Sequence, residues 1–331
     1  MSRTASPSKS SSVAVLSRLT NLTVVVAFVL ICLFFSVTTD SFLTTANLTN
    51  LLVNNVVLIA IVALGMTIVV SSGGIDLSVG TSVDLSSMAF LMLLAAGYGA
   101  LAGIAAALGA ALLVGLFNAI LITRLRISPF LATLGVLFIG QSVQQLATDG
   151  GQPIYLITGD TTALFTAIAR GTVLGMPLPV VVLAGLSVAV YLLLHRTVFG
   201  RHVAALGAQP GVVWYSGISV AGRLSSVYVL AALLAGVTGI LLSATVRSYV
   251  PLSGNAFLLD AIGATFIGTT LSSERRPSVL GTLLGVLLLA VVKNGLLLIG
   301  WNFYWQQVGI GLLVFIVLAV SFGTRSVSQR H

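Results

Sequence analysis

Long apolar runs, separated by short polar segments, extend along almost the whole chain. A helix needs about 20 residues to cross the hydrocarbon core of a bilayer. Ten runs approach this length, and because backbone amides cannot stay unpaired in lipid, each run is predicted to be a transmembrane helix. The ten predicted spans cover residues 21–37, 51–71, 81–96, 101–123, 130–147, 178–194, 227–244, 258–271, 279–299 and 304–322.

The composition excludes a soluble globular protein. Only 7% of the residues are charged and 57% are hydrophobic, whereas soluble domains carry about 25% charged residues to solvate their surface. The sequence therefore predicts an all-α polytopic membrane protein. The first apolar run resembles a signal peptide in following a basic segment, but it lacks a clear cleavage site, and we expect it to be a retained span.

The distribution of basic residues predicts the orientation. With ten spans and a cytoplasmic N-terminus, 12 of the 15 Lys and Arg residues fall in cytoplasmic segments, as the positive-inside rule requires. Because these charges lie mostly in short loops, the net charge of +8 does not indicate a nucleic-acid partner. Both termini are predicted to be cytoplasmic, with a basic tail over 1–20, a transmembrane domain over 21–322 and a second tail over 323–331.

A weak internal similarity links two parts of the chain. Residues 117–139 resemble residues 293–316, with Asn118 opposite Asn294. The two copies are five predicted spans apart, an odd number, so they would run in opposite directions. Inverted repeats of this kind are common in transporters.

The segment GGIDLSVG, residues 73–80, predicts a break between two helices. Gly73 and Gly74 release the backbone, and Asp76 or Ser78 can accept hydrogen bonds from the freed amides of a restarted helix. One interpretation is a cap at a turn near the membrane edge. The other is that the break lines or shapes a translocation pathway, since an ionisable residue inside a membrane needs a partner or a wet cavity.

Two further charges lie in or beside predicted spans. Asp260 starts the eighth predicted span and is interpreted as its N-cap, which the helix dipole favours. Lys293 lies within the ninth and should not face lipid. It is expected to pair with a carboxylate, Asp260 or Asp76, or to extend towards an interface.

Several segments in order resemble the ribose-type permeases of bacterial ABC importers, and the similarity covers nearly the whole chain. The matching segments are GGIDLSVG (73–80), SPFLATLG (128–135), TVFGRHVAALG (197–207), YSGISV (215–220), LLDAIGATFIGTTL (258–271), VLGTLLG (279–285) and residues 294–322.

This resemblance implies a permease subunit that moves a simple sugar, or a sugar-like molecule, across the inner membrane by ATP-driven alternating access. The partners it implies are two cytoplasmic ATPase subunits, a periplasmic or lipid-anchored sugar-binding protein and a second permease. ATP and Mg²⁺ would bind the ATPase, because this chain has no phosphate-binding G-x-x-x-x-G-K-[ST] loop. No catalytic residue, cofactor or metal site is predicted in the chain itself.

The long cytoplasmic segment 195–223 resembles the family's coupling element, a short helix that docks on the ATPase. It carries a run of Val and aromatic residues that is expected to be exposed. It departs from the family at GAQPGVVWYSGI (207–218), where Pro210 and Gly211 disfavour an early helix start unless Pro210 occupies the first turn. The residues assigned to this contact are Pro210, Val213, Trp214, Tyr215, Ser216 and Gly217. The alternative is that the aromatic rings lie at the level of the lipid headgroups.

Two points leave the assignment open. Glu274, Arg275 and Arg276 replace a segment that is glycine-rich in the family, which could indicate a heterodimeric permease. The rival hypothesis is an ion-coupled secondary transporter that uses Asp76, Asp260 and Lys293.

Overall fold

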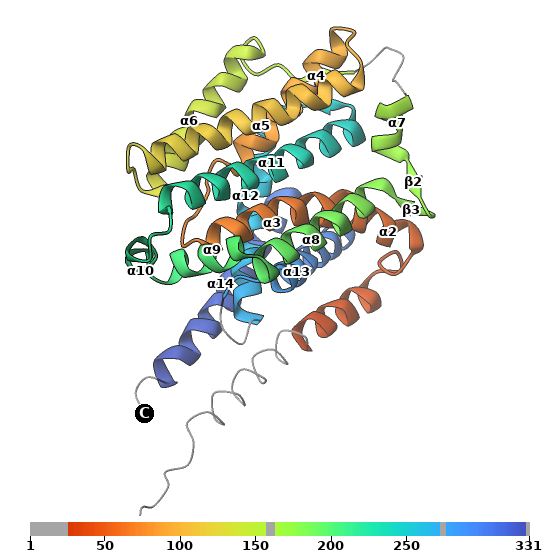
Figure 1. Cartoon of the computed structure of the whole chain (residues 1–331). Coiled ribbons are helices and arrows are strands. Elements are labelled where there is room, and N and C mark those ends of the chain that lie inside the picture. The colour runs from red at the N-terminus through yellow and green to blue at the C-terminus, as the bar shows by residue number, and fades with distance from the viewer. Residues whose placement is uncertain (1–25, 157–162, 272–275, 329–331) are drawn as a thin grey trace, which may run out of the picture.

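The structure, a computed structural model, describes residues 26–156, 163–271 and 276–328 and is a bundle of helices (Figure 1). The N-terminal tail over residues 1–20 lies outside the described residues. After a helix over Val26–Thr38, the elements are α2 (Thr45–Asn50), the π-helical turn η1 (Leu51–Val56), α3 (Val57–Ser71), α4 (Val79–Ala95), α5 (Ala100–Thr123), α6 (Pro129–Ala147), β1 (Ile154–Tyr155), α7 (Ala163–Arg170), β2 (Thr172–Val173), β3 (Met176–Pro177), α8 (Leu178–Arg196), α9 (Val198–Ala208), α10 (Pro210–Tyr215), α11 (Val220–Val246), β4 (Ser248–Tyr249), α12 (Asn255–Leu271), α13 (Val279–Leu298) and α14 (Phe303–Ser328).

Each of the ten predicted spans falls on a helix, although the first begins outside the described residues. Among the described residues, six helices are long and apolar enough to cross a membrane: Thr45–Ser71, Ala100–Thr123, Pro129–Ala147, Leu178–Arg196, Val220–Val246 and Val279–Leu298. This confirms an all-α polytopic membrane protein. The count of ten spans and the orientation of the termini stay predictions.

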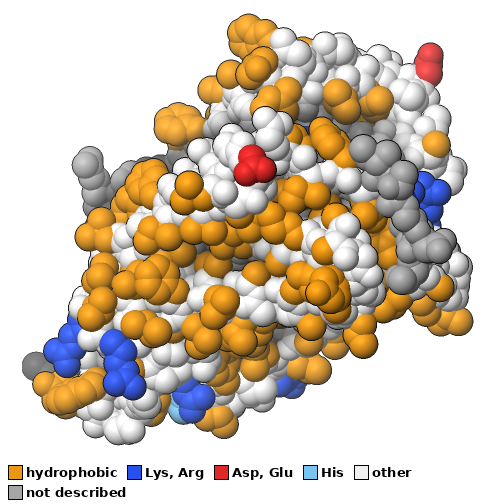
Figure 2. All heavy atoms as spheres, turned by 90° about the horizontal axis from the view of Figure 1, so that it is seen from above, with side chains coloured by type: hydrophobic (Ala, Val, Ile, Leu, Met, Phe, Trp, Pro, Cys, Tyr) orange, Lys and Arg blue, Asp and Glu red, His pale blue; other side chains and the backbone are white. Residues whose placement is uncertain are grey.

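Helix α3 forms the centre of the bundle. Thirteen of its 15 residues are buried, and α8, α9, α11, α12 and α13 all pack against it. In contrast, α8 buries only Pro179 and Val190. Figure 2 shows apolar side chains over most of one face, with basic side chains gathered mainly towards one end. Such a surface suits lipid, where exposed apolar side chains carry no cost.

The helix contacts repeat with the predicted offset of five spans. Helix α4 packs on α5, α6 and α11, and α12 packs on α13, α14 and α3. In the order of the predicted spans, α4 is the third and α12 the eighth. The partners of α4 (α5, α6 and α11) are the fourth, fifth and seventh, and the partners of α12 (α13, α14 and α3) are the ninth, tenth and second. Each pair of corresponding partners is therefore five spans apart. This is the arrangement that an internal repeat of five spans predicts.

The two ends of the bundle carry different elements (Figure 1). At one end lie α7 and the short antiparallel pair β2–β3. At the other end lies α10, in the long segment 195–223 between two predicted spans. Most of residues 195–223 is helical, and only short turns separate α8, α9, α10 and α11.

Candidate functional site

The predicted helix break is present between α3 and α4. Helix α3 ends at Ser71 and α4 begins at Val79. Gly73 adopts a left-handed backbone conformation with φ of +84°, which glycine tolerates without strain. The amides of Gly73 and Gly74 still bond back to the last turn of α3, to the carbonyls of Val70 and Val69. The double glycine therefore ends α3 and turns the chain, as the sequence predicted.

Asp76 is held by hydrogen bonds within the break. Its Oδ1 accepts from the Ser78 amide at 2.8 Å and from the Ser78 hydroxyl at 2.6 Å. Asn118 of α5 donates its Nδ2 to the Ser78 Oγ at 2.7 Å. Asp76 thus accepts the amide that precedes α4, while the Ser78 side chain makes no capping bond to that helix. Asp76 therefore binds the residue that precedes α4 and accepts no amide of the helix itself, and the prediction that Ser78 caps α4 is wrong.

The whole cluster lies in the packed interior. Asp76, Ser78 and Asn118 are fully buried. Tyr228 of α11 lies over the break, and a Cβ atom on Gly74 would collide with its hydroxyl. In this conformation the residues of the break shape the junction between α3, α4, α5 and α11, and neither Asp76 nor Ser78 is exposed to an open passage.

Asp260 and Lys293 form a buried ion pair. The Lys293 Nζ contacts the Asp260 Oδ2, and the two side chains are only 17% and 4% exposed. Helix α12 begins at Asn255, so Asp260 lies in its second turn. The N-cap interpretation is therefore wrong, because the helix starts earlier than the apolar pattern suggested. Of the partners considered for Lys293, Asp260 is the one it contacts, and not Asp76.

A third buried carboxylate, Asp84, which sequence reasoning missed, fixes the connection between α11 and α12. The Asp84 Oδ1 accepts from the Gly254 amide at 2.7 Å and from the Ser253 hydroxyl at 3.1 Å. Beside it, the Gln144 Oε1 accepts from the Tyr249 hydroxyl and the Leu252 amide, both at 2.9 Å. A charged residue inside the apolar run 81–96 was the available signal.

The segment assigned to ATPase coupling contains α9 and α10. Pro210 occupies the first position of α10, so a helix does begin there. Trp214 and Tyr215 are 65% and 84% exposed, and their rings meet edge to face at 4.9 Å between centroids. Val213 is buried, so it packs inward and the expectation of a fully exposed run is wrong at this residue. Pro210, Ser216 and Gly217 are exposed.

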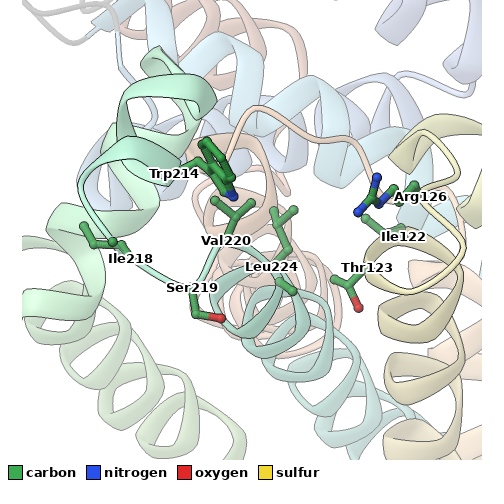
Figure 3. Close-up of a pocket in the computed structure, with 10 residues that line it drawn as sticks. Ile122, Thr123, Arg126, Trp214, Ile218, Ser219, Val220 and Leu224 are labelled. Carbon is green, nitrogen blue, oxygen red and sulfur yellow. The ribbon is translucent and has the colours of Figure 1, made fainter.

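A cavity of about 720 Å³ opens beside α10. Figure 3 shows Trp214 on one side of it and Arg126, from the turn after α5, on the other, with Val220 and Leu224 of α11 between them. The hollow therefore lies between α10, the start of α11 and the turn after α5.

Comparison with known proteins identifies the family. Residues 47–318 match the family described as the permease component of the branched-chain amino acid transport system. The chain belongs to this family. It is 35% identical over 284 residues to the ribose import permease protein of Bacillus subtilis, covering 86% of this chain and 87% of the relative. The corresponding protein of Escherichia coli K12 is 32% identical over 295 residues, covering 89% and 91%.

Another relative is named for a different substrate. The autoinducer 2 import system permease protein of Yersinia pestis (strain Pestoides F) is 34% identical over 275 residues, covering 82% of this chain and 81% of the relative. No solved structure matches. As a permease of this family with several apolar helices, the chain is a multi-pass protein of the bacterial inner membrane.

The charged segment Glu274, Arg275 and Arg276, which departs from the family pattern, lies only partly within the described residues. Glu274 and Arg275 lie outside the described residues. Arg276 is exposed, just before the N-cap of α13 at Ser278. The proposal of a heterodimeric permease therefore stays a prediction.

Proposed function

We propose that this permease is the membrane-spanning subunit of an ABC importer for ribose or a related sugar-like molecule. The observation that carries the proposal is the similarity to ribose import permeases over more than four-fifths of the chain. Transport would proceed by alternating access, powered by ATP hydrolysis in a separate subunit, because this sequence has no phosphate-binding loop of its own.

The exposed aromatic face of α10 supports the proposed contact with the ATPase. Exposed Trp and Tyr side chains are the residue types that contribute most to protein–protein binding when a partner buries them. Trp214 and Tyr215 supply this surface, and the cavity beside Trp214 offers a recess for a partner side chain. In this proposal the α10 end of the bundle faces the cytoplasm, which agrees with the distribution of basic residues.

The remaining partners follow from the same proposal. A periplasmic or lipid-anchored binding protein would deliver the sugar to the opposite end, where α7 and the β2–β3 pair lie, and a second permease would complete the pathway. Co-purification of the full chain with candidate ATPase and binding-protein subunits tests this assembly. Recovery of the chain without any ATPase would contradict it.

Uptake in membrane vesicles tests the energy source. Uptake of radiolabelled ribose should survive a protonophore and should stop when the ATPase carries an inactivating substitution. Uptake by the purified permease alone, abolished by the protonophore, would instead support an ion-coupled transporter. The Asp260–Lys293 pair does not favour that rival, since each charge already has its partner and Asp76 is not part of the pair.

A competition series tests the substrate. Unlabelled ribose, other pentoses and hexoses, and autoinducer 2 should be compared as competitors of ribose uptake and as ligands of the binding protein. Competition by sugars or autoinducer 2, and none by branched-chain amino acids, is the expected result. Inhibition by leucine or valine alone would contradict a sugar substrate.

A further inference from the structure

We propose that the contact between Gly73 and Gly207 carries movement of the α9–α10 arm into the membrane-spanning bundle, which makes these two glycines positioning residues for transport. The inference rests on the proposed function, because it assumes that an ATPase moves α10. It goes further in naming the point at which that movement reaches the helix break.

The two glycines bring backbone against backbone. A Cβ atom on Gly207 would collide with the Ser71 carbonyl oxygen and would lie 3.1 Å from the Gly73 nitrogen. In return, a Cβ atom on Gly73 would lie 3.2 Å from the Gly207 Cα. Because no side chain separates α9 from the break at this point, a shift of α9 must displace the backbone of the break.

The arm is built to move as one piece. A single residue, Gln209, separates α9 from α10, and its amide bonds back to the Ala205 carbonyl at 2.9 Å. Val203, Leu206 and Val213 are buried, so both short helices are packed down against the bundle. A push on the exposed face of α10 therefore reaches α9 without a flexible link between them.

The other side of the break is closed by α11. Gly74 faces the Tyr228 hydroxyl with no room for a side chain. The double glycine thus has one contact to each neighbour, Gly73 to α9 and Gly74 to α11. The break is therefore held between α9 and α11, the helix that follows the arm.

The first turn of α4 passes the movement on. A Cβ atom on Gly80 would lie 2.7 Å from the Gly254 carbonyl oxygen, and Asp84 accepts the Gly254 amide. The start of α4 is therefore tied to the start of α12. The resulting route runs from α10 through α9 and the break to α4 and the α11–α12 connection.

Gly207→Ala tests the contact, with Gly185→Ala as the matched control. Both replace a helical glycine, but a Cβ atom on Gly185 meets nothing within 4 Å. The readout is the rate at which N-ethylmaleimide labels Ser72→Cys, on a Cys32→Ser background, in the reconstituted complex with its ATPase. With ATP and orthovanadate this rate should change about tenfold in the control, a typical size for coupling between sites.

In Gly207→Ala the nucleotide-dependent change in labelling should be lost, while ATP hydrolysis and co-purification with the ATPase stay within about twofold of the control. Ribose uptake per ATP hydrolysed should fall in parallel. An unchanged labelling response in a complex that still hydrolyses ATP would overturn the inference and leave the proposed function intact. Absence of any ATPase in the complex with the unmodified chain would overturn both.

A second variant covers the case in which Gly207→Ala does not fold. Insertion of two glycines after Gln209 leaves the Gly73–Gly207 contact untouched and loosens only the link between α9 and α10. The expected result is the same loss of nucleotide-dependent labelling at residue 72 with ATPase binding retained. A full labelling response in this variant would show that the arm is not the route.

Discussion

Asp76 and Asp260 are both buried carboxylates in one helical bundle, but the bundle accommodates them in different ways. Asp260 has a cation, Lys293, on the neighbouring helix, and the pair joins α12 to α13. Asp76 has no basic partner among the described residues and is held by the amide and hydroxyl of Ser78. The ion pair joins two regular helices, whereas at the turn the hydrogen bonds from Ser78 reach only the Oδ1 of Asp76 and leave its Oδ2 buried without a partner in the part of the chain that the structure describes.

This difference predicts that the two sites respond unequally to substitution. Lys293→Met removes the cation and leaves Asp260 buried and unpaired, so the free energy of unfolding should fall by about 3–5 kcal/mol. Denaturant titration in mixed micelles measures this change. The double variant Lys293→Met with Asp260→Leu should recover most of the loss, since no charge is then buried. A single variant within about 1 kcal/mol of the parent would contradict the assignment of this pair.

Asp76→Ala should have the next largest effect. It leaves the Ser78 amide buried without an acceptor, which costs about 1–3 kcal/mol. Asp76→Asn keeps an acceptor oxygen and should cost less than half as much in the same titration. Equal losses in the two variants would mean that the charge of Asp76, and not its hydrogen bonds, holds the break.

Asn118→Ala should be milder, at about 1 kcal/mol, because it removes one donor to the Ser78 hydroxyl. A double-mutant cycle with Ser78→Ala isolates the interaction, since two residues in direct contact should not have additive effects. Strict additivity would show that the Asn118–Ser78 bond contributes nothing to the stability of the break.

Trp214→Ala should have the smallest effect on stability, within about 0.5 kcal/mol, because the side chain is exposed. Its effect should appear in assembly, as a loss of co-purification with the ATPase of about tenfold. Trp305→Ala is the matched control, since Trp305 is 60% exposed but lies in the first turn of α14, which follows the C-terminal end of α13. Normal assembly and uptake in Trp214→Ala would remove this residue from the contact.

The features that the sequence predicted correctly are local ones. An apolar run of sufficient length forms a helix in a membrane whatever its neighbours are, because its backbone N–H and C=O groups must form hydrogen bonds with one another in lipid. The double glycine of the break acts because glycine has no Cβ atom and tolerates a positive φ. Pro210 suits the start of α10 because proline has a fixed φ and no N–H group to donate. Each of these could be found from a short stretch of sequence.

The features that were missed or wrong join distant residues. Asp260 was wrongly assigned to its own helix terminus, and the sequence left Asp260 and Asp76 as alternative partners of Lys293, of which packing selected Asp260, 33 residues away. Asp84 was not singled out because its donors, Ser253 and Gly254, lie about 170 positions along the chain. Val213 belongs to an apolar and aromatic run, and only packing decided that it points inward while Trp214 points outward.

The sequence by itself determined that the chain is a helical membrane protein, where one helix breaks, and that Pro210 is compatible with a helix start only in the first turn. The reason is that transfer into lipid and backbone geometry depend on each segment alone. Tertiary structure alone decided which carboxylate receives a cation and that Gly207 lies against Gly73. Those outcomes depend on which helices become neighbours, and no local sequence pattern identifies the residues that come into contact.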